Sequence, residues 1–349
     1  MPGRSGRLCG LLIVTAWLAL SGCSRQETVT ERFLAFGTLI EISIYGADTE
    51  LTQEALRVAR KDLDYMHEAW HAWRPNALGR INMLIPTGAS FTGSPTMVQM
   101  ILASQRLAEQ SEGLFNPAIG RLIALWGFQS DEPPSGPPPD ATRIEALLAE
   151  RPRMSDLTVD GVRIRADNAA VRLDFGAFAK GYGIDLVSER LKELGVHNAI
   201  INAGGDLRAF GRPGSRAWRI GIRHPRDTGV LASLEIRNDE SVFTSGDYER
   251  YFDHAGRRYH HILDPRTGYP ADGAISATVI HSDAATADAA STALFVAGPR
   301  DWRRIAARMG IEQVMIVDRE GRVHLSRAMA ERIRFETEPK PETLVDPGL

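Results

Sequence analysis

The sequence predicts an α+β fold with mixed sheets and helices packed against them. Ile40, Ile42 and Ile44 alternate with polar residues, which is the period of a half-buried strand. Between residues 184 and 194, apolar residues recur at the three- and four-residue spacing of an amphipathic helix. Strand-like and helix-like segments follow one another without strict alternation, which favours α+β over a doubly wound parallel sheet.

Length, composition and charge limit the class of protein. The chain has 349 residues, of which 43% are hydrophobic and 24% charged, as is typical of a globular protein of one large or two modest domains. The net charge of −3 gives no excess of basic residues for nucleic acid, so we expect no nucleic-acid partner. Two cysteines exclude a disulfide-rich scaffold and a four-cysteine zinc site.

The first residues predict an export signal. Arg4 and Arg7 precede an apolar run that ends at Leu20, a pattern typical of a secretory signal peptide and too short for a membrane span. The following Ser-Gly-Cys resembles the end of a bacterial lipoprotein signal. We therefore expect removal of residues 1–22, a lipid on Cys23, and a tether over residues 23–32 that holds the protein at a bacterial membrane, with the folded domain in the periplasm or otherwise outside the cytoplasmic membrane. An ordinary cleaved signal with an incidental cysteine is the alternative.

We expect one folded domain over residues 33–335 and a frayed tail at 336–349, because the tail is rich in charge and proline. The proline-rich run Asp131–Pro139 excludes regular structure and predicts a surface loop. In the first half we expect strand structure over Phe33–Tyr45 and helices over Glu50–Trp70, Pro95–Ser111 and Thr142–Glu150, the last opened by a capping box of Thr142 and Glu145. In the second half we expect a hairpin of Val162–Ile164 with Val171–Leu173, a helix over 184–194, a strand at Trp218–Ile222, a hairpin over Tyr248–Leu263, helices over Ala284–Val296 and Asp301–Met309, and a hairpin of Val314–Val317 with Val323–Leu325.

Two glycine-rich segments could bind a ligand. The common motifs GxGxxG after a strand, GxxxxGK[ST], HExxH, GxSxG and paired CxxC are absent. Leu173–Gly183 lies at a strand-to-helix junction, where glycines let the backbone approach a ligand, amides at the helix start attract anions, and Lys180 adds a positive charge. Asn202–Asp206 follows an apolar strand. Taken alone, each segment could equally be an ordinary turn.

Two further segments carry side chains that could do chemistry. In the run from Tyr259 to Gly268, a histidine beside Asp264 could act as a general base, and only one of His260 and His261 can face the site because strand neighbours point to opposite faces. Asp288 and Thr292 share a helix face, with Ser291 beside them, and such hard oxygen ligands suit Mg²⁺. A hydrogen-bonded core histidine and a solvated polar stripe are the alternative interpretations.

The order of these segments closely resembles the FAD:protein FMN transferase family, also called ApbE-type. Matching stretches cover about residues 33–325. Phe36 stands where many members have Met, and Arg74 follows Trp73 in a segment that is often acidic in the family. Besides the four segments above, the matching stretches are Phe36–Thr38, Ala72–Asn82, Gly113–Pro117, Leu125–Phe128 and Ser245–Tyr248.

The resemblance implies an ApbE-like, T-fold-related architecture, FAD as substrate and Mg²⁺ as cofactor. It also implies transfer of FMN to a Ser or Thr hydroxyl of an acceptor flavoprotein subunit, with release of AMP. By the same resemblance, Asp288, Thr292 and Ser291 bind the metal together with the backbone carbonyl of Ala177. His261 is our candidate for the base that accepts the proton of the acceptor hydroxyl. The implied FAD contacts are Phe36, Trp73, Leu114, Phe115, Asn116, Asp174, Lys180 and Ile262.

Two other functions remain open at this point. With water as acceptor, the same site would be an FAD pyrophosphatase that yields FMN and AMP. Without turnover, the protein would be a non-catalytic FAD-binding lipoprotein.

Overall fold

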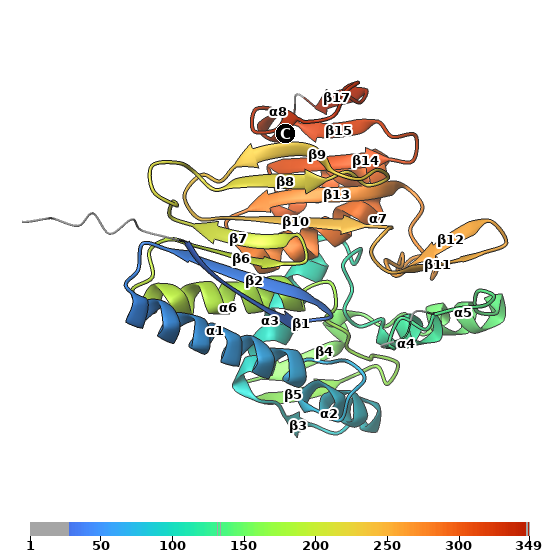
Figure 1. The fold of residues 1–349 in the computed structure, drawn as a ribbon. Helices are drawn as coiled ribbons and strands as arrows, with labels where there is room; N and C mark the ends of the chain where they lie inside the picture. The colour runs from blue at the N-terminus through green and yellow to red at the C-terminus, as the bar shows by residue number, and fades with distance from the viewer. Residues whose placement is uncertain (1–27, 131, 133, 347, 349) are drawn as a thin grey trace, which may run out of the picture.

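A computed structural model describes residues 28–130, 132, 134–346 and 348 (Figure 1). The predicted signal peptide and Cys23 lie outside these residues. Among the helices that are described, none combines the length and apolar character needed to cross a membrane.

A nine-stranded sheet forms the centre of the molecule (Figure 1). Neighbouring strands in it are antiparallel, except that the last two are parallel. Ile40, Ile42 and Ile44 are buried, which confirms the alternation predicted from the sequence. In spatial order the strands are β1 (Thr28–Ala35), β2 (Thr38–Tyr45), β6 (Ala199–Ala203), β7 (Asp206–Phe210), β10 (Glu240–Gly246), β13 (Ala274–His281), β14 (Gln313–Asp318), β15 (Val323–Ser326) and β17 (Thr343–Asp346).

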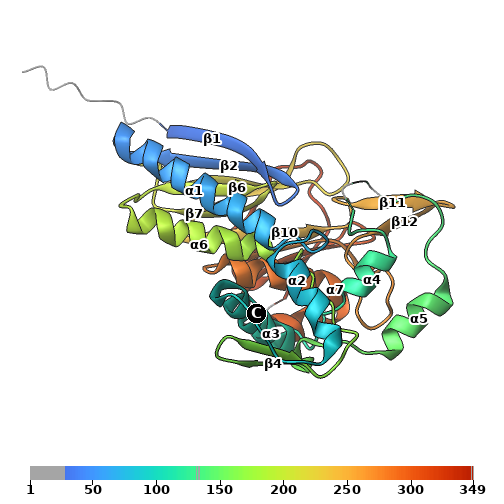
Figure 2. The ribbon, with the colours of Figure 1, turned by 90° about the horizontal axis from the view of Figure 1, so that it is seen from below.

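Long helices cover one face of this sheet (Figure 2). The Ala-rich helix α7 (Ala284–Met309) packs on the central strands and against α6 (Ala179–Glu193), which in turn packs against α1 (Thr49–Ala69). The other helices are α2 (Ala77–Leu84), α3 (Pro95–Gln110), α4 (Gly120–Leu125), α5 (Ala141–Ala149) and α8 (Arg327–Ala330), with short 3₁₀ turns at Ile85–Thr87 and Met154–Asp156.

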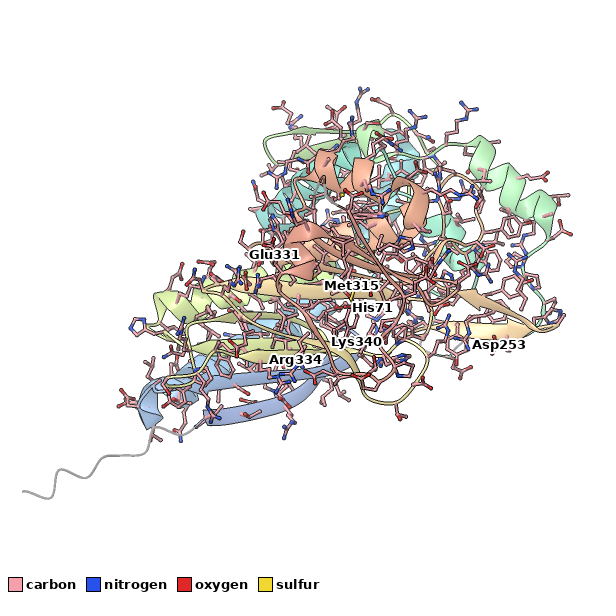
Figure 3. The ribbon with its side chains drawn as sticks, turned by 90° about the horizontal axis from the view of Figure 1, so that it is seen from above. His71, Asp253, Met315, Glu331, Arg334 and Lys340 are labelled. Carbon is pink, nitrogen blue, oxygen red and sulfur yellow. The ribbon has the colours of Figure 1, made fainter. Side chains whose placement is uncertain are left out.

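Smaller sheets complete the fold. A sheet of β16 (Arg334–Phe335), β9 (Val230–Glu235) and β8 (Arg219–Arg223) covers the other face of the central sheet through a second apolar cluster. The hairpin of β11 (Tyr251–His254) and β12 (Arg257–His260) projects beside α4 and α5 (Figure 3, where Asp253 marks it). A third sheet contains β3 (Phe91–Thr92), β5 (Arg163–Ala166) and β4 (Leu157–Asp160). The α+β class is thereby confirmed.

The predicted ends of the domain were wrong. Residues 336–349 were expected to fray, but Thr343–Asp346 form β17, which pairs in parallel with β15. The N–H of Val323 donates to the carbonyl of Glu342 (2.8 Å), and Arg303 forms an ion pair with Asp346. At the other end, β1 begins at Thr28, inside the stretch predicted as tether. Backbone pairing with a neighbouring strand orders both segments despite their polar composition.

Two local predictions also need correction. Asp140, rather than the box of Thr142 and Glu145, caps α5, because its carboxylate accepts the N–H of Thr142 (2.8 Å). β5 pairs with β4 and β3 rather than with Val171–Leu173, since the chain turns back at Gly161. The two helices predicted over 284–309 are confirmed, because the segment α7 breaks at Gly298, whose φ of 64° a residue with a side chain rarely adopts.

Candidate active site

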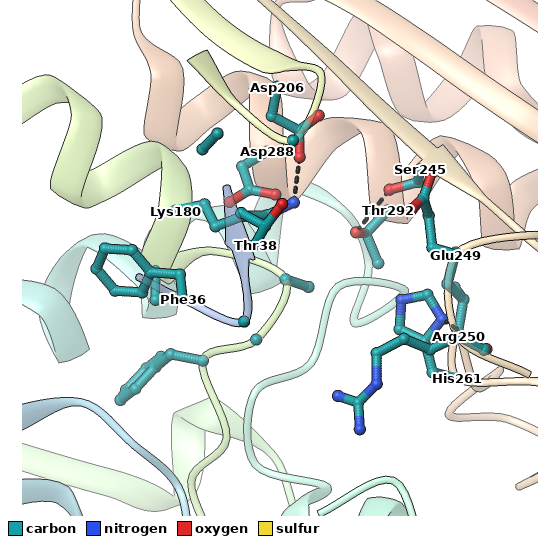
Figure 4. A pocket seen from close by; sticks show the side chains of 18 of the residues that line it. Phe36, Thr38, Lys180, Asp206, Ser245, Glu249, Arg250, His261, Asp288 and Thr292 are labelled. Carbon is teal, nitrogen blue, oxygen red and sulfur yellow. Dashed lines mark hydrogen bonds and ion pairs between the residues drawn. The ribbon is translucent and has the colours of Figure 1, made fainter. Parts of the chain in front are cut away.

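A deep cavity of about 820 Å³ opens beside the ends of several central strands (Figure 4). This volume is within the range of small-molecule sites. Its walls come from the β1–β2 turn, the end of α1, the start of α6, β8, the end of β10 and the first turns of α7. Of the residues predicted for the site, those that line the cavity are Phe36, Trp73, Leu114, Phe115, Asn116, Asp174, Ala177, Lys180, His261, Ile262, Asp288 and Thr292.

One end of the cavity is aromatic. Phe36 occupies the tight turn between β1 and β2 with a φ of 51°, a conformation that costs a bulky residue energy. Its N–H donates to Nδ1 of His67 (3.1 Å), and the two rings meet edge to face. Trp73 and His71 lie next along the wall with ring centroids 4.2 Å apart. This end therefore offers flat apolar surfaces to a planar ring system.

Charged side chains gather around Lys180 in another part of the cavity (Figure 4). The Lys180 ammonium forms an ion pair with Asp206, whose other carboxylate oxygen accepts the N–H of Thr244 (2.9 Å). Burial disfavours the charged form of Lys180, but Asp206 and Asp288 outweigh it and raise the Lys180 pKa. Lys180 is therefore a cation at neutral pH that is held at the cavity wall, where it can attract a phosphate.

Asp288 is a second buried carboxylate beside the same lysine. One of its oxygens accepts the N–H of Gly181 (2.9 Å). Burial, together with Asp206, raises the pKa of Asp288 to about 7 against the opposing effect of Lys180. The buried carboxylates of Asp206 and Asp288 thus lie beside a single cation, Lys180. A divalent cation would offset this excess of negative charge.

The oxygen atoms around Asp288 are those that Mg²⁺ prefers. The Thr292 hydroxyl lies one turn further along α7 and hydrogen-bonds to Oγ of Ser245 (3.1 Å), while Ala177 lines the cavity nearby. The residues therefore fit a Mg²⁺ ion with one carboxylate and neutral oxygen ligands. Within the described part of the chain, no three His, Cys, Asp or Glu side chains gather as an alternative metal site.

Ser291 is the predicted site residue that does not reach the cavity wall. Its side chain is buried, donates to the backbone carbonyl of Asp288 (2.9 Å) and hydrogen-bonds to Oγ of Ser245 (2.9 Å). Ser291 lies behind Thr292, so metal binding by Ser291 stays a prediction.

His261 faces the cavity and His260 faces the core, as the alternation of strand neighbours predicts. Nδ1 of His261 lies 3.2 Å from the carbonyl of Arg250, and because a carbonyl only accepts, Nδ1 carries the hydrogen and Nε2 keeps a free lone pair. Loss of hydration, with His260 and Arg250 nearby, lowers the pKa of His261. The ring is neutral at pH 7 and can accept a proton.

Two predicted FAD contacts also have structural roles. Asp174 accepts hydrogen bonds from the Gln129 amide (2.6 Å) and from the Gly176 N–H (2.9 Å), which fixes the start of the glycine-rich segment. Asn116 donates to the carbonyl of Pro152 (3.0 Å) and accepts the N–H of Ala118. Both side chains hold the cavity wall in shape while they line it.

Sequence analysis missed three residues of the site. Asp206 and Ser245 stand inside segments that were singled out, but their partners Lys180 and Thr292 are distant in sequence. His67 had one local signal that could have been used, because it stands in the last turn of α1 only four residues before His71.

An α+β fold around a cavity that combines aromatic side chains with a lysine, carboxylates and hydroxyls is typical of nucleotide-binding enzymes that act at a phosphate. The chain belongs to the ApbE family, whose sequence model matches residues 36–315.

Individual relatives agree with this assignment. The chain is 41% identical to the FAD:protein FMN transferase of Rhodobacter capsulatus, over 99% of this chain and 67% of the relative. The crystal structure of the ApbE protein from Thermotoga maritima superposes with a TM-score of 0.81 at 32% identity, covering 89% of this chain and 100% of that one. The apo flavinyl transferase ApbE of Pseudomonas stutzeri gives a TM-score of 0.77 at 31% identity, covering 88% of this chain and 96% of that one.

Proposed function

We propose that this protein is a transferase that moves the FMN part of FAD to a Ser or Thr hydroxyl of an acceptor protein, with Mg²⁺ as cofactor and AMP as leaving product. The observation that carries this proposal is one cavity that combines aromatic walls, a lysine with two buried carboxylates, and a neutral histidine. Relatives named FAD:protein FMN transferase support the same activity.

The aromatic and the charged parts of the cavity match the two parts of the substrate. The isoalloxazine ring of FAD would lie against the aromatic end, near Phe36 and Trp73. The pyrophosphate would then lie toward Lys180, which is placed to attract its negative charge. FAD would in this way bring the phosphorus on the FMN side near His261.

Asp288, Thr292 and the carbonyl of Ala177 are the residues that would hold Mg²⁺. When bound there, the ion would offset the charge of the pyrophosphate and of the departing AMP phosphate. Lys180 adds a second positive charge at the same end, kept in place by Asp206.

His261 would act on the acceptor hydroxyl. The hydrogen bond from Nδ1 to the Arg250 carbonyl orients the ring and leaves Nε2 available to take the hydroxyl proton. The hydroxyl oxygen then forms a bond to the FMN phosphorus, and the bond from that phosphorus to the AMP oxygen breaks. No thiol intermediate is needed.

The membrane as a partner is proposed on the basis of the sequence alone. The Leu-Ser-Gly-Cys boundary supports a lipid on Cys23 that would hold the domain at a bacterial membrane, outside the cytoplasm. The acceptor would then be a flavoprotein subunit at the same membrane.

The test is to incubate the purified protein with FAD and Mg²⁺, with and without a co-expressed flavoprotein subunit. We expect covalent FMN on the subunit by mass spectrometry, at a Ser or Thr, with AMP released in equal amount. Fast AMP release without acceptor and without labelling would instead support the pyrophosphatase. Tight FAD binding without any AMP would support the non-catalytic flavin-binding protein. His261→Ala is the matched control for background labelling.

A further inference from the structure

Asp185 joins α6 to the first turn of α7. One of its carboxylate oxygens accepts the N–H of Ala284 (2.9 Å) and the other accepts the N–H of Ala285 (2.8 Å). The helix already has an N-cap in Asp283, which accepts the N–H of Thr286 (2.7 Å). Asp185 therefore acts as a second N-cap of α7 that comes from a different helix, so it also ties α7 to α6.

A second contact between the two helices lies one turn away. Gly181, one turn before Asp185 on α6, donates its N–H to Asp288, one turn after Ala284 on α7. A Cβ at position 181 would lie 2.2 Å from the carbonyl oxygen of Ala284, so the two backbones touch here. The two pairs of contacts fix both the axial position and the rotation of α7 relative to α6.

Two side chains of the strand β7 bind Lys180 and Asp185 of α6. Asp206 and Arg208 are two positions apart on this strand, so their side chains share a face. Asp206 pairs with Lys180 at the start of α6, and the buried Arg208 guanidinium donates to Asp185 (2.5 Å). Arg208 also donates to Asp239 (2.8 and 2.9 Å).

We propose that Asp185 is a positioning residue, which by binding the N–H groups of Ala284 and Ala285 sets the place of Asp288 and Thr292 relative to Lys180. Asp185 does not line the cavity, so it acts only through α7. The inference rests on the proposed function, because it assigns Asp288 and Thr292 to the metal. Residues that orient metal ligands typically change metal affinity or activity about 10- to 100-fold when removed.

The test compares Asp185→Ala with Asp239→Ala. Asp239 accepts hydrogen bonds from the same Arg208 but makes none to α7 within the described residues, so its loss removes part of the ion network without moving the helix. For Asp185→Ala we expect the half-saturating Mg²⁺ concentration for AMP release to rise about tenfold or more. We expect FAD binding without Mg²⁺ to change less than about twofold, because the aromatic end is untouched. Asp239→Ala should leave the Mg²⁺ dependence unchanged.

Two readouts do not depend on turnover. Calorimetric titration of Mg²⁺ into the FAD complex should show the same loss of affinity for Asp185→Ala. Hydrogen–deuterium exchange should rise at residues 284–288 in Asp185→Ala and not in Asp239→Ala. Asp185→Asn, which keeps one acceptor oxygen, should fall between wild type and Asp185→Ala and decides the question if the alanine variant does not fold.

The outcomes separate the two proposals. If wild type needs no Mg²⁺ or transfers no FMN, the proposed function is wrong. If wild type requires Mg²⁺ but the Asp185 variants match Asp239→Ala in Mg²⁺ affinity, the positioning role is wrong and the proposed function stands. A rise in exchange at 284–288 without any change in Mg²⁺ affinity also overturns the positioning role.

Discussion

The neighbouring residues His260 and His261 differ in how many of their ring nitrogens are hydrogen-bonded within the protein. His260 uses both ring nitrogens inside the protein, one toward the Ala271 carbonyl (2.9 Å) and one toward the Ile262 N–H (3.3 Å). His261 uses one, and its other nitrogen faces the cavity. The difference arises where β12 ends, because its last residue, His260, points into the core and the next residue, His261, points into the cavity.

His261→Ala should slow FMN transfer by about 10²- to 10⁴-fold, the usual loss of a general base, with little change in FAD binding. Because the pKa of His261 is lowered, the ring stays neutral as the pH falls from 7.5 to 6, and the wild-type rate at saturating Mg²⁺ should hold over that range. Steady-state rates against pH are the measurement. A midpoint near 6.5, or greater damage from His260→Ala than from His261→Ala, would contradict the assignment.

Asp288→Ala should remove the one carboxylate assigned to the metal and reduce the rate severely at every Mg²⁺ concentration. FAD should still bind through the aromatic end. Thr292→Ala should act in the same direction but less strongly, because a neutral ligand contributes less than a charged one, and Thr292→Ser should retain part of the activity. Turnover against Mg²⁺ concentration is the measurement, and an unchanged profile for Asp288→Ala would place the metal elsewhere.

At the scale of elements, the β1–β2 turn is held in an uncommon conformation by a helix. Phe36 has a positive φ, and the hydrogen bond from its N–H to His67 of α1 keeps the ring at the cavity. The turn is thus fixed by contact with α1 rather than by its own residues, as is typical of strained positions at binding sites.

His67→Ala should loosen this turn and raise KM for FAD about three- to tenfold, which corresponds to the ~0.5–1.5 kcal/mol of one hydrogen bond. The value of kcat should change little, because Phe36 has no group that takes part in the reaction at the phosphate. Initial rates at varied FAD concentration test this. Tyr65→Ala, on the exposed side of the same helix, is the control, and an equal KM in both variants would show that His67 does not hold Phe36.

At the scale of the whole molecule, the cavity is formed by segments spread over more than half of the chain. The C-terminal strand β17 belongs to the central sheet and does not line the cavity. Residues from Leu34 to Thr292 line the cavity, and none after Thr292 does within the described residues. β17 contributes instead to the far edge of the central sheet, where it covers β15.

Removal of residues 342–349 should therefore lower stability and spare the chemistry. It deletes the pairing of β17 with β15 and the ion pair of Asp346 with Arg303, a loss of about 1–3 kcal/mol. Thermal unfolding should show a melting temperature lower by several degrees, with FMN transfer per folded molecule unchanged. A large loss of activity in protein that is still folded would show that β17 shapes the site.

Cys23→Ser should release the protein from the membrane fraction without changing FAD turnover. The expected reason is loss of the acyl chains that anchor the domain. Membrane fractionation followed by activity assay of both fractions is the measurement. No redistribution between the fractions would exclude Cys23 as the anchor.

The sequence alone determined the α+β class, most helices and hairpins, and twelve of the residues that line the cavity. The class and the elements depend on local patterns, namely the apolar periods of strands and helices. Most of the cavity residues came instead from the resemblance of short segments such as Leu173–Gly183 to the family. Strand alternation limited the site to one of His260 and His261, and the family resemblance selected His261.

The tertiary structure alone decided which of these residues act together. Lys180 meets Asp206, Gly181 meets Asp288, and Asp185 meets the start of α7, all between segments that are distant in sequence. Such pairs arise from the packing of α6 and α7 on the central sheet, where a charged group can be buried only beside its partner. The formation of β17 also depends on tertiary structure, because a polar tail becomes a strand only when the edge of a neighbouring strand accepts and donates its backbone hydrogen bonds.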